Sequence, residues 1–149
     1  MAKKPAPGGN LQELKTQLKS KDLGRLYIFH GEEVFLLHHY LEQMKKQLLD
    51  ALSEKYPHSN FVLTMGSYGV ICRLEKACCS HPAYQVQVVD TTGAGDTFCG
   101  YFLTGLCQQQ ALADCLKSAS AAAAIAVSRA GAAPSIPTRD EVEVFLRNQ

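Results

Sequence analysis

The segment VVDTTGAGDTFCGYF, residues 88–102, limits the possible folds more than any other part of the chain. Its apolar start predicts the end of a strand, its glycines predict a tight loop, and its apolar end predicts a helix. Gly93 and Gly95 can adopt backbone angles that other residues avoid, and they let a ligand approach the main chain. The amides from Gly93 to Asp96 would then point outward at a helix start, which favours an anion.

Asp96 places a carboxylate inside this anion-binding loop. Nearby amides and the helix dipole favour a charged carboxylate, so Asp96 could serve as a base at neutral pH. The loop would stabilise the charge of a transferring phosphoryl group, while Asp96 takes the proton of the attacking hydroxyl. The alternative is that Asp96 is only a helix-start acid, worth about 0.3 kcal/mol. For an isolated G-x-G-D pattern, that alternative is the better interpretation.

Hydrophobic periodicity and turn residues predict the other elements. A first helix is expected from a cap at Asn10 to Gly24, and a second, long helix that stops before Pro57. Further helices are expected after the glycine loop, at about Leu112–Val127, and from a Thr138–Glu141 capping box onward. Strands are expected at Leu26–Phe29, Asn60–Gly66, Val70–Leu74 and Tyr84–Val88, with the second and third forming a hairpin. Strands that alternate with helices predict an α/β fold with a mixed or parallel sheet.

Composition narrows the classes of function and partner. The 149 residues carry a net charge of +1, which gives no reason to expect nucleic acid or an anionic membrane as a partner. No apolar run approaches the roughly 20 residues of a membrane helix. The six cysteines are single or form one adjacent pair, which is typical of reduced thiols in a cytoplasmic protein. The CCSH stretch, Cys78–His81, could start a metal site, but no second ligand pair follows at zinc spacing.

Nine consecutive residues, DTTGAGDTF at Asp90–Phe98, fit the C-terminal signature of the ribokinase or PfkB family of carbohydrate kinases. The chain resembles this family from about Lys55 to Leu146, including the stretches VLTMGSYG and AAAAIAVSRAGAAPSIPTRDEVEVFL. The resemblance implies a partial ribokinase-like fold, a three-layer α/β arrangement with helices on the faces of a sheet. It also implies ATP-dependent phosphorylation of a sugar hydroxyl, with Mg²⁺ and, in many members, K⁺.

The resemblance also implies a set of site residues. Asp96 would be the catalytic base, and Gly93, Ala94 and Gly95 would form the anion hole. The remaining assignments are Gly66, Gly69 and Gly131 for the nucleotide, and Asp90, Thr92 and Ser135, with the loop from Arg129 to Ser135, for a monovalent cation. No residue is assigned to a divalent metal.

Several features of that family are not found in this sequence. Complete members are about twice this length, and they carry a sugar-binding Gly-Gly segment, lid strands and an Asn-x-x-Glu motif that helps to hold magnesium. The one Asn-x-x-Glu here, Asn10–Glu13, is interpreted as a helix cap. The expectation is therefore a nucleotide-binding fragment that is weak or inactive alone, whose sugar the sequence does not reveal. An uncovered sheet edge would favour self-association.

The first 50 residues resemble a different family. LKSKDLGRLYIFHGEEVFLLHHYLEQMKKQL is similar to the N-terminus of the delta subunit of the bacterial DNA polymerase III clamp loader. Its HGEE turn, His30–Glu33, has no Lys-Ser/Thr pair and cannot hold a phosphate as a Walker loop does. The sequence is therefore interpreted as a chimera, with a helix–strand–helix leader at 1–50 and a kinase region at 51–149. The alternative function is a non-enzymatic interaction or assembly module.

Overall fold

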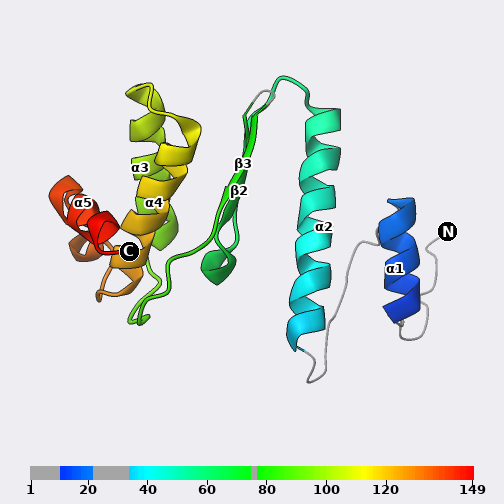
Figure 1. The fold of residues 1–149 in the computed structure, drawn as a ribbon, viewed down its shortest axis with the longest axis horizontal. Helices are drawn as coiled ribbons and strands as arrows, with labels where there is room; N and C mark the ends of the chain where they lie inside the picture. The colour runs from blue at the N-terminus through cyan, green and yellow to red at the C-terminus, as the bar shows by residue number, and fades with distance from the viewer. Residues whose placement is uncertain (1–10, 22–33, 75–76) are drawn as a thin grey trace. The chain divides into compact units, whose positions relative to one another are not determined.

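The computed structural model describes residues 11–21, 34–74 and 77–149, with the backbone alone for 34–38, 41 and 42. The chain divides into two compact units, Met1–Pro57 and His58–Gln149, each of which is described by itself (Figure 1). The predicted cap at Asn10, strand at Leu26–Phe29 and turn at His30–Glu33 lie outside the described residues. No described helix combines the length and hydrophobicity needed to span a membrane.

The first unit contains helices α1, Leu11–Ser20, and α2, Val34–Lys55. Both follow from apolar residues at helical spacing, and a small cluster of Leu14, Leu18, Tyr40 and Met44 joins them. As predicted, α2 ends before Pro57. The prediction that the first helix reaches Gly24 is wrong, because α1 ends at Ser20 and Lys21 adopts the left-handed conformation with φ 56°.

The second unit contains a three-stranded sheet in the order β1-β2-β3. Its strands are β1, Phe61–Thr64, β2, Val70–Leu74, and β3, Ala77–His81. The predicted hairpin is confirmed, with a short 3₁₀ turn, η1 at Gly66–Tyr68, between β1 and β2. The expected mixed or parallel sheet is not seen, since both described pairings are antiparallel. Consecutive strands joined by short connections pair antiparallel, whereas parallel strands need a long crossover.

Two strand assignments differ from the sequence prediction. β3 was not predicted, because its sequence ACCSH contains none of the residues enriched in strands. Conversely, the predicted strand Tyr84–Val88 is irregular in the structure. Its pattern alternates as a strand should, but the described residues offer it no ladder partner. The chain is instead fixed just beyond it, where the Val89 amide donates to the Val127 carbonyl at 2.8 Å.

Three helices complete the second unit and match the prediction closely. They are α3, Ala94–Cys107, α4, Leu112–Val127, and α5, Arg139–Arg147, with a 3₁₀ turn η2 at Ala133–Ser135 between the last two. The predicted capping box of Thr138 and Glu141 is present at the start of α5. Figure 1 shows α3 and α4 side by side, between the sheet and α5.

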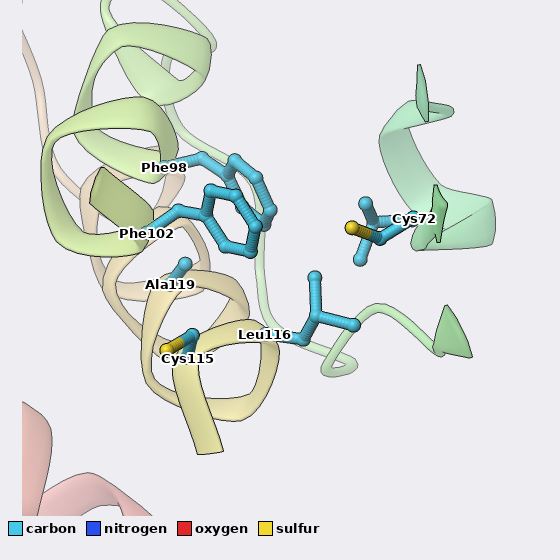
Figure 2. Close-up of a cluster of buried hydrophobic side chains, with 7 residues drawn as sticks. Cys72, Phe98, Phe102, Cys115, Leu116 and Ala119 are labelled. Atoms are coloured by element: carbon cyan, nitrogen blue, oxygen red, sulfur yellow. The ribbon is translucent and has the colours of Figure 1, made fainter. Parts of the chain in front are cut away.

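The core of this unit lies between the α3–α4 pair and the sheet. Figure 2 shows Phe98 and Phe102 pointing from α3 toward Cys72 of β2, and the two rings stack with centroids 5.8 Å apart. Cys115, Leu116 and Ala119 contribute the α4 side of this cluster. All six cysteines are free, and burial raises the pKa of the Cys72 thiol to about 11. Cys72 is therefore a packing residue rather than a reactive thiol.

Gly105 is the point at which α3 packs most tightly on α4. A Cβ at Gly105 would lie 2.8 Å from the Cys115 sulfur. We therefore expect Gly105→Ala to destabilise the protein by about 1–3 kcal/mol through overpacking. The matched control is Gly100→Ala in the same helix, where a Cβ would meet nothing within 4 Å. That control should gain up to about 1 kcal/mol of helix propensity. Urea unfolding of both variants checks this, and equal stabilities would contradict it.

Candidate functional site

The glycine loop leads directly into the N-terminus of α3. Gly93 caps the helix in the left-handed conformation with φ 76°, and a Cβ there would lie 3.2 Å from the Ala132 α-carbon. No side chain of the described residues caps this helix start. Because the first amides of a helix have no intrahelical acceptor, the amides near Gly95 and Asp96 can serve a ligand. Of the predicted anion hole of Gly93, Ala94 and Gly95, the Ala94 amide donates to the Thr91 carbonyl at 3.3 Å, so Gly95 supplies the helix-start amide that suits an anion.

A cavity of about 550 Å³ opens beside this helix start. Its size falls within the range of small-molecule sites. The described residues that line it are all uncharged: Thr64, Gly66, Ser67, Gly69, Val70, Ala83, Tyr84, Gln85, Val86, Val88, Thr91, Ala94, Gly95, Phe98, Ser120, Ala123, Ala124 and Val127. The cavity therefore suits a group without charge, while the helix start at its wall suits an anion.

The glycines assigned to the nucleotide, and Gly95 of the anion hole, differ in why the structure needs a residue without a side chain. A Cβ at Gly66 or Gly95 would meet nothing within 4 Å, so their lack of a side chain keeps space open at the cavity. At Gly69, with φ 92°, a Cβ would lie only 2.1 Å from the His81 carbonyl oxygen. Gly69 thus lines the cavity and is also required by the close approach of two backbone segments. Gly131, with φ 85°, does not line the cavity.

Asp90 joins the glycine loop to the loop that follows α4. Its Oδ1 accepts a hydrogen bond from the Thr92 amide and its Oδ2 accepts one from the Gly131 amide, both at 2.9 Å. Hydrogen bonds from Thr92 and then from Gly131 lower the pKa of Asp90 below its ordinary value, since they favour the charged carboxylate. The structure therefore brings Asp90, Thr92 and the predicted loop of the cation site together.

Ser135, the third residue assigned to the cation, is fully buried in that loop. Its hydroxyl donates to the Ala132 carbonyl at 2.7 Å and keeps its lone pairs for another partner. Asp90, Thr92 and Ser135 all carry side-chain oxygen atoms, which is the ligand chemistry that K⁺ requires, and the Asp90–Gly131 bond joins the two loops that contain them. The residues present therefore fit a monovalent cation. For a divalent metal, the described residues contain no cluster of three or more His, Cys, Asp or Glu side chains, and Cys78–His81 is part of no such cluster.

Asp96 lies in the first turn of α3 and is exposed. It follows Gly95, which lines the cavity, and Asp96 itself is not part of the cavity wall. The next residue, Thr97, is buried, and its hydroxyl has no partner among the described residues. At this position Asp96 can act as a proton acceptor next to a bound anion. The same position is also that of an ordinary acidic residue in the first turn of a helix.

Sequence reasoning missed most of the cavity wall, although part of its pattern was visible. The segment around the predicted strand contributes Ala83, Tyr84, Gln85, Val86 and Val88, so neighbouring residues line the cavity and not only alternate ones. The wall residues of α4 are Ser120, Ala123, Ala124 and Val127, a helical i, i+3, i+4, i+7 stripe. Ser120 is the polar member of this stripe and is 8% exposed. Helical periodicity could have identified the α4 stripe, whereas the wall at residues 83–88 follows no simple alternation and is recognised only in the folded structure.

A left-handed glycine turn, an uncapped helix start and an adjoining uncharged cavity are typical of an α/β protein that binds a phosphorylated ligand. The chain belongs to the pfkB family of carbohydrate kinases, whose sequence profile matches residues 30–139. This match begins inside the predicted leader at 1–50. The resemblance of that leader to the clamp-loader delta subunit remains a prediction.

Known relatives agree with this membership. The ribokinase of Lactococcus lactis is 34% identical over 110 residues, which are 74% of this chain and 36% of the relative. The solved ribokinase of Thermotoga maritima matches 93% of this chain and 40% of its own, with 30% identity and a TM-score of 0.61. Arabidopsis thaliana ribokinase, solved with ribose and ATP, matches 71% of this chain and 34% of its own, with 32% identity and a TM-score of 0.64. These matches show a ribokinase-like α/β fold, and the chain spans little more than a third of these relatives.

Glu141 supports the loop beside the site, and its titration makes the stability of the fold depend on pH. Hydrogen bonds from Arg129 and then from Thr138 lower the pKa of Glu141 from 4.5 to about 2. The charged form therefore adds stability above pH 4.5, which is lost as the pH falls toward 2. Unfolding of the wild type and of Glu141→Gln, followed from pH 7 to pH 2, should show a stability difference that shrinks across this window. A difference that stays constant would contradict the assignment.

Proposed function

We propose that this chain provides the nucleotide- and phosphate-binding part of a kinase that transfers a phosphoryl group from ATP to a sugar hydroxyl. The observation that carries the proposal is the uncapped N-terminus of α3 at the wall of an uncharged cavity. Family membership supports it, as does the Arabidopsis relative, which was solved with ribose and ATP. Because the chain spans about a third of its relatives, the complete activity belongs to the proposal as well.

The electrostatics of the site suggest which part of a nucleotide would occupy which region. The uncharged cavity would take the base and ribose, and the hydroxyl of Ser120 offers a hydrogen bond there. The phosphates would lie at the amides of Gly93, Ala94 and Gly95, where the α3 dipole favours negative charge. Among the described residues no Lys or Arg lines the cavity, so backbone amides would take the place of cationic side chains there.

In the reaction, Asp96 would accept the proton of the attacking hydroxyl, and the same amides would stabilise the charge that develops on the phosphoryl group. Asp90, Thr92 and Ser135 would hold K⁺, which neutralises charge next to this loop. Mg²⁺, when bound with ATP, neutralises the phosphate oxygens. Because the described residues form no divalent cluster, the phosphates themselves would be its main ligands.

Three further points belong to the same proposal. The sugar would be bound by parts of a family kinase that this sequence does not match. We expect the chain alone to bind nucleotide weakly, because no Asn-x-x-Glu magnesium motif accompanies its glycine loop. β1 has one strand neighbour among the described residues, and its sequence FVLT carries neither charge nor proline. Such an edge favours pairing with a second copy of the chain. The six free thiols fit a reducing compartment such as the cytoplasm.

The nucleotide site can be tested by closing it at Gly95. We expect Gly95→Leu to weaken ATP binding at least about tenfold, equivalent to about 1.4 kcal/mol, because a side chain would fill the approach to the amides. Gly100→Leu is the matched control, since a Cβ there also meets nothing within 4 Å but Gly100 does not line the cavity. Calorimetric titration with ATP and Mg²⁺ provides the measurement. Equal affinities in the two variants, or no saturable wild-type binding at millimolar ATP, would overturn the proposal.

The role of Asp96 can be tested by Asp96→Asn. The carboxamide keeps the shape but accepts no proton, so we expect transfer to fall by about 10² to 10⁴ with nucleotide affinity nearly unchanged. The assay would supply the N-terminal part of a family kinase as a separate chain and follow ADP release with a panel of sugars. Asp114→Asn is the control, because Asp114 is also a first-turn helix acid, in α4. Transfer that survives Asp96→Asn would leave Asp96 as a helix-start acid only.

A further inference from the structure

One carboxylate outside the cavity closes the loop that runs from Arg129 to Thr138. Glu141 Oε1 accepts from Arg129 Nη2 at 2.5 Å, directly after α4. Glu141 Oε2 accepts from the Thr138 amide at 2.6 Å and from its hydroxyl at 3.0 Å. Both ends of the loop are therefore fixed to the same side chain, and the bond from Arg129 is charge-assisted, which is the stronger kind.

The same loop contacts the proposed nucleotide site near its start, at Gly131. The Gly131 amide donates to Asp90 Oδ2, whose other oxygen accepts from Thr92 in the glycine loop. Gly131 has φ 85°, and a glycine loses more conformational freedom than any other residue when it is fixed. The Asp90–Gly131 contact therefore needs support from the rest of the loop. A third contact, from the Tyr101 hydroxyl to the Pro137 carbonyl at 2.8 Å, ties the end of the loop to α3.

We propose that Glu141 is a positioning residue of the nucleotide site, which acts through the Arg129–Thr138 loop on the carboxylate of Asp90. This inference rests on the proposed function. Glu141 does not line the cavity, and its side chain bonds to Arg129 and Thr138 at the two ends of the loop, so the proposed effect reaches Asp90 through Gly131. Because Asp90 also belongs to the proposed cation set, a displaced loop would disturb K⁺ and phosphate binding together.

The first test uses the full chain without nucleotide. Glu141→Gln keeps a capping-box residue at this position but removes the charged acceptor of Arg129. Glu143→Gln is the matched control, because Glu143 lies in the same helix and pairs with the exposed Arg139 of α5 rather than with a residue of the loop. Hydrogen exchange of the Gly131 amide should be about tenfold faster in Glu141→Gln, as expected for a local opening made easier, and unchanged in the control. Equal exchange in both variants would overturn the inference.

The second test measures ADP affinity at a temperature at which every variant is folded. We expect Glu141→Gln to raise the Kd about 3- to 10-fold, the usual range for a coupled remote residue, and to raise the K⁺ concentration needed for binding. Added to Asp90→Asn, the change should have little further effect, because both act through one contact. Faster Gly131 exchange with an unchanged Kd, or fully additive effects, would overturn the positioning role. If the wild type binds no ADP at millimolar concentration, the proposed function fails, whereas the exchange measurement still decides whether Glu141 holds Gly131.

Discussion

The hydrogen bonds of the Asp90 carboxylate are the interaction on which the arrangement of the site depends. They connect two loops that are 41 residues apart in the sequence, measured from Asp90 to Gly131. Each loop contains a glycine in the left-handed region, Gly93 and Gly131, and such backbone is ordered only when its surroundings hold it. Two amide donors stabilise the charged carboxylate, and the carboxylate in turn holds the two loops together.

Close packing of α3 on α4 provides the frame for that contact. Gly105 leaves room for Cys115, and the alanines of α4 at 119, 121, 122 and 126 are fully buried. Small residues let the helices approach closely, and the antiparallel turn between them brings the C-terminal half of α4 back to the start of α3. Ser120 and Val127 thus face Gly95 across one cavity. The helix pair forms one wall of the cavity, and the β1–β2 hairpin and the segment from Ala83 to Val88 form the rest.

The sequence predicted the elements whose signals are local. Helical spacing located α2, α3 and α4, the Thr138–Glu141 box located the start of α5, and Gly66 and Gly69 marked the hairpin between β1 and β2. The sequence-based prediction failed where a neighbouring strand decides whether a segment forms a strand. Tyr84–Val88 has a strand pattern but no described neighbour to pair with, whereas Ala77–His81 has a poor strand sequence and is a strand because β2 supplies its ladder.

The candidate site divides in the same way. The sequence alone determined the glycine loop, the acid at Asp96 and membership in a kinase family, because backbone freedom at glycine and the charge of a helix start are properties of a short segment. Only the tertiary structure decided that Asp90 is satisfied by Gly131, that the cavity wall is uncharged, and that Glu141 closes the loop next to it. These features depend on contacts between segments far apart in the chain, which no local pattern specifies.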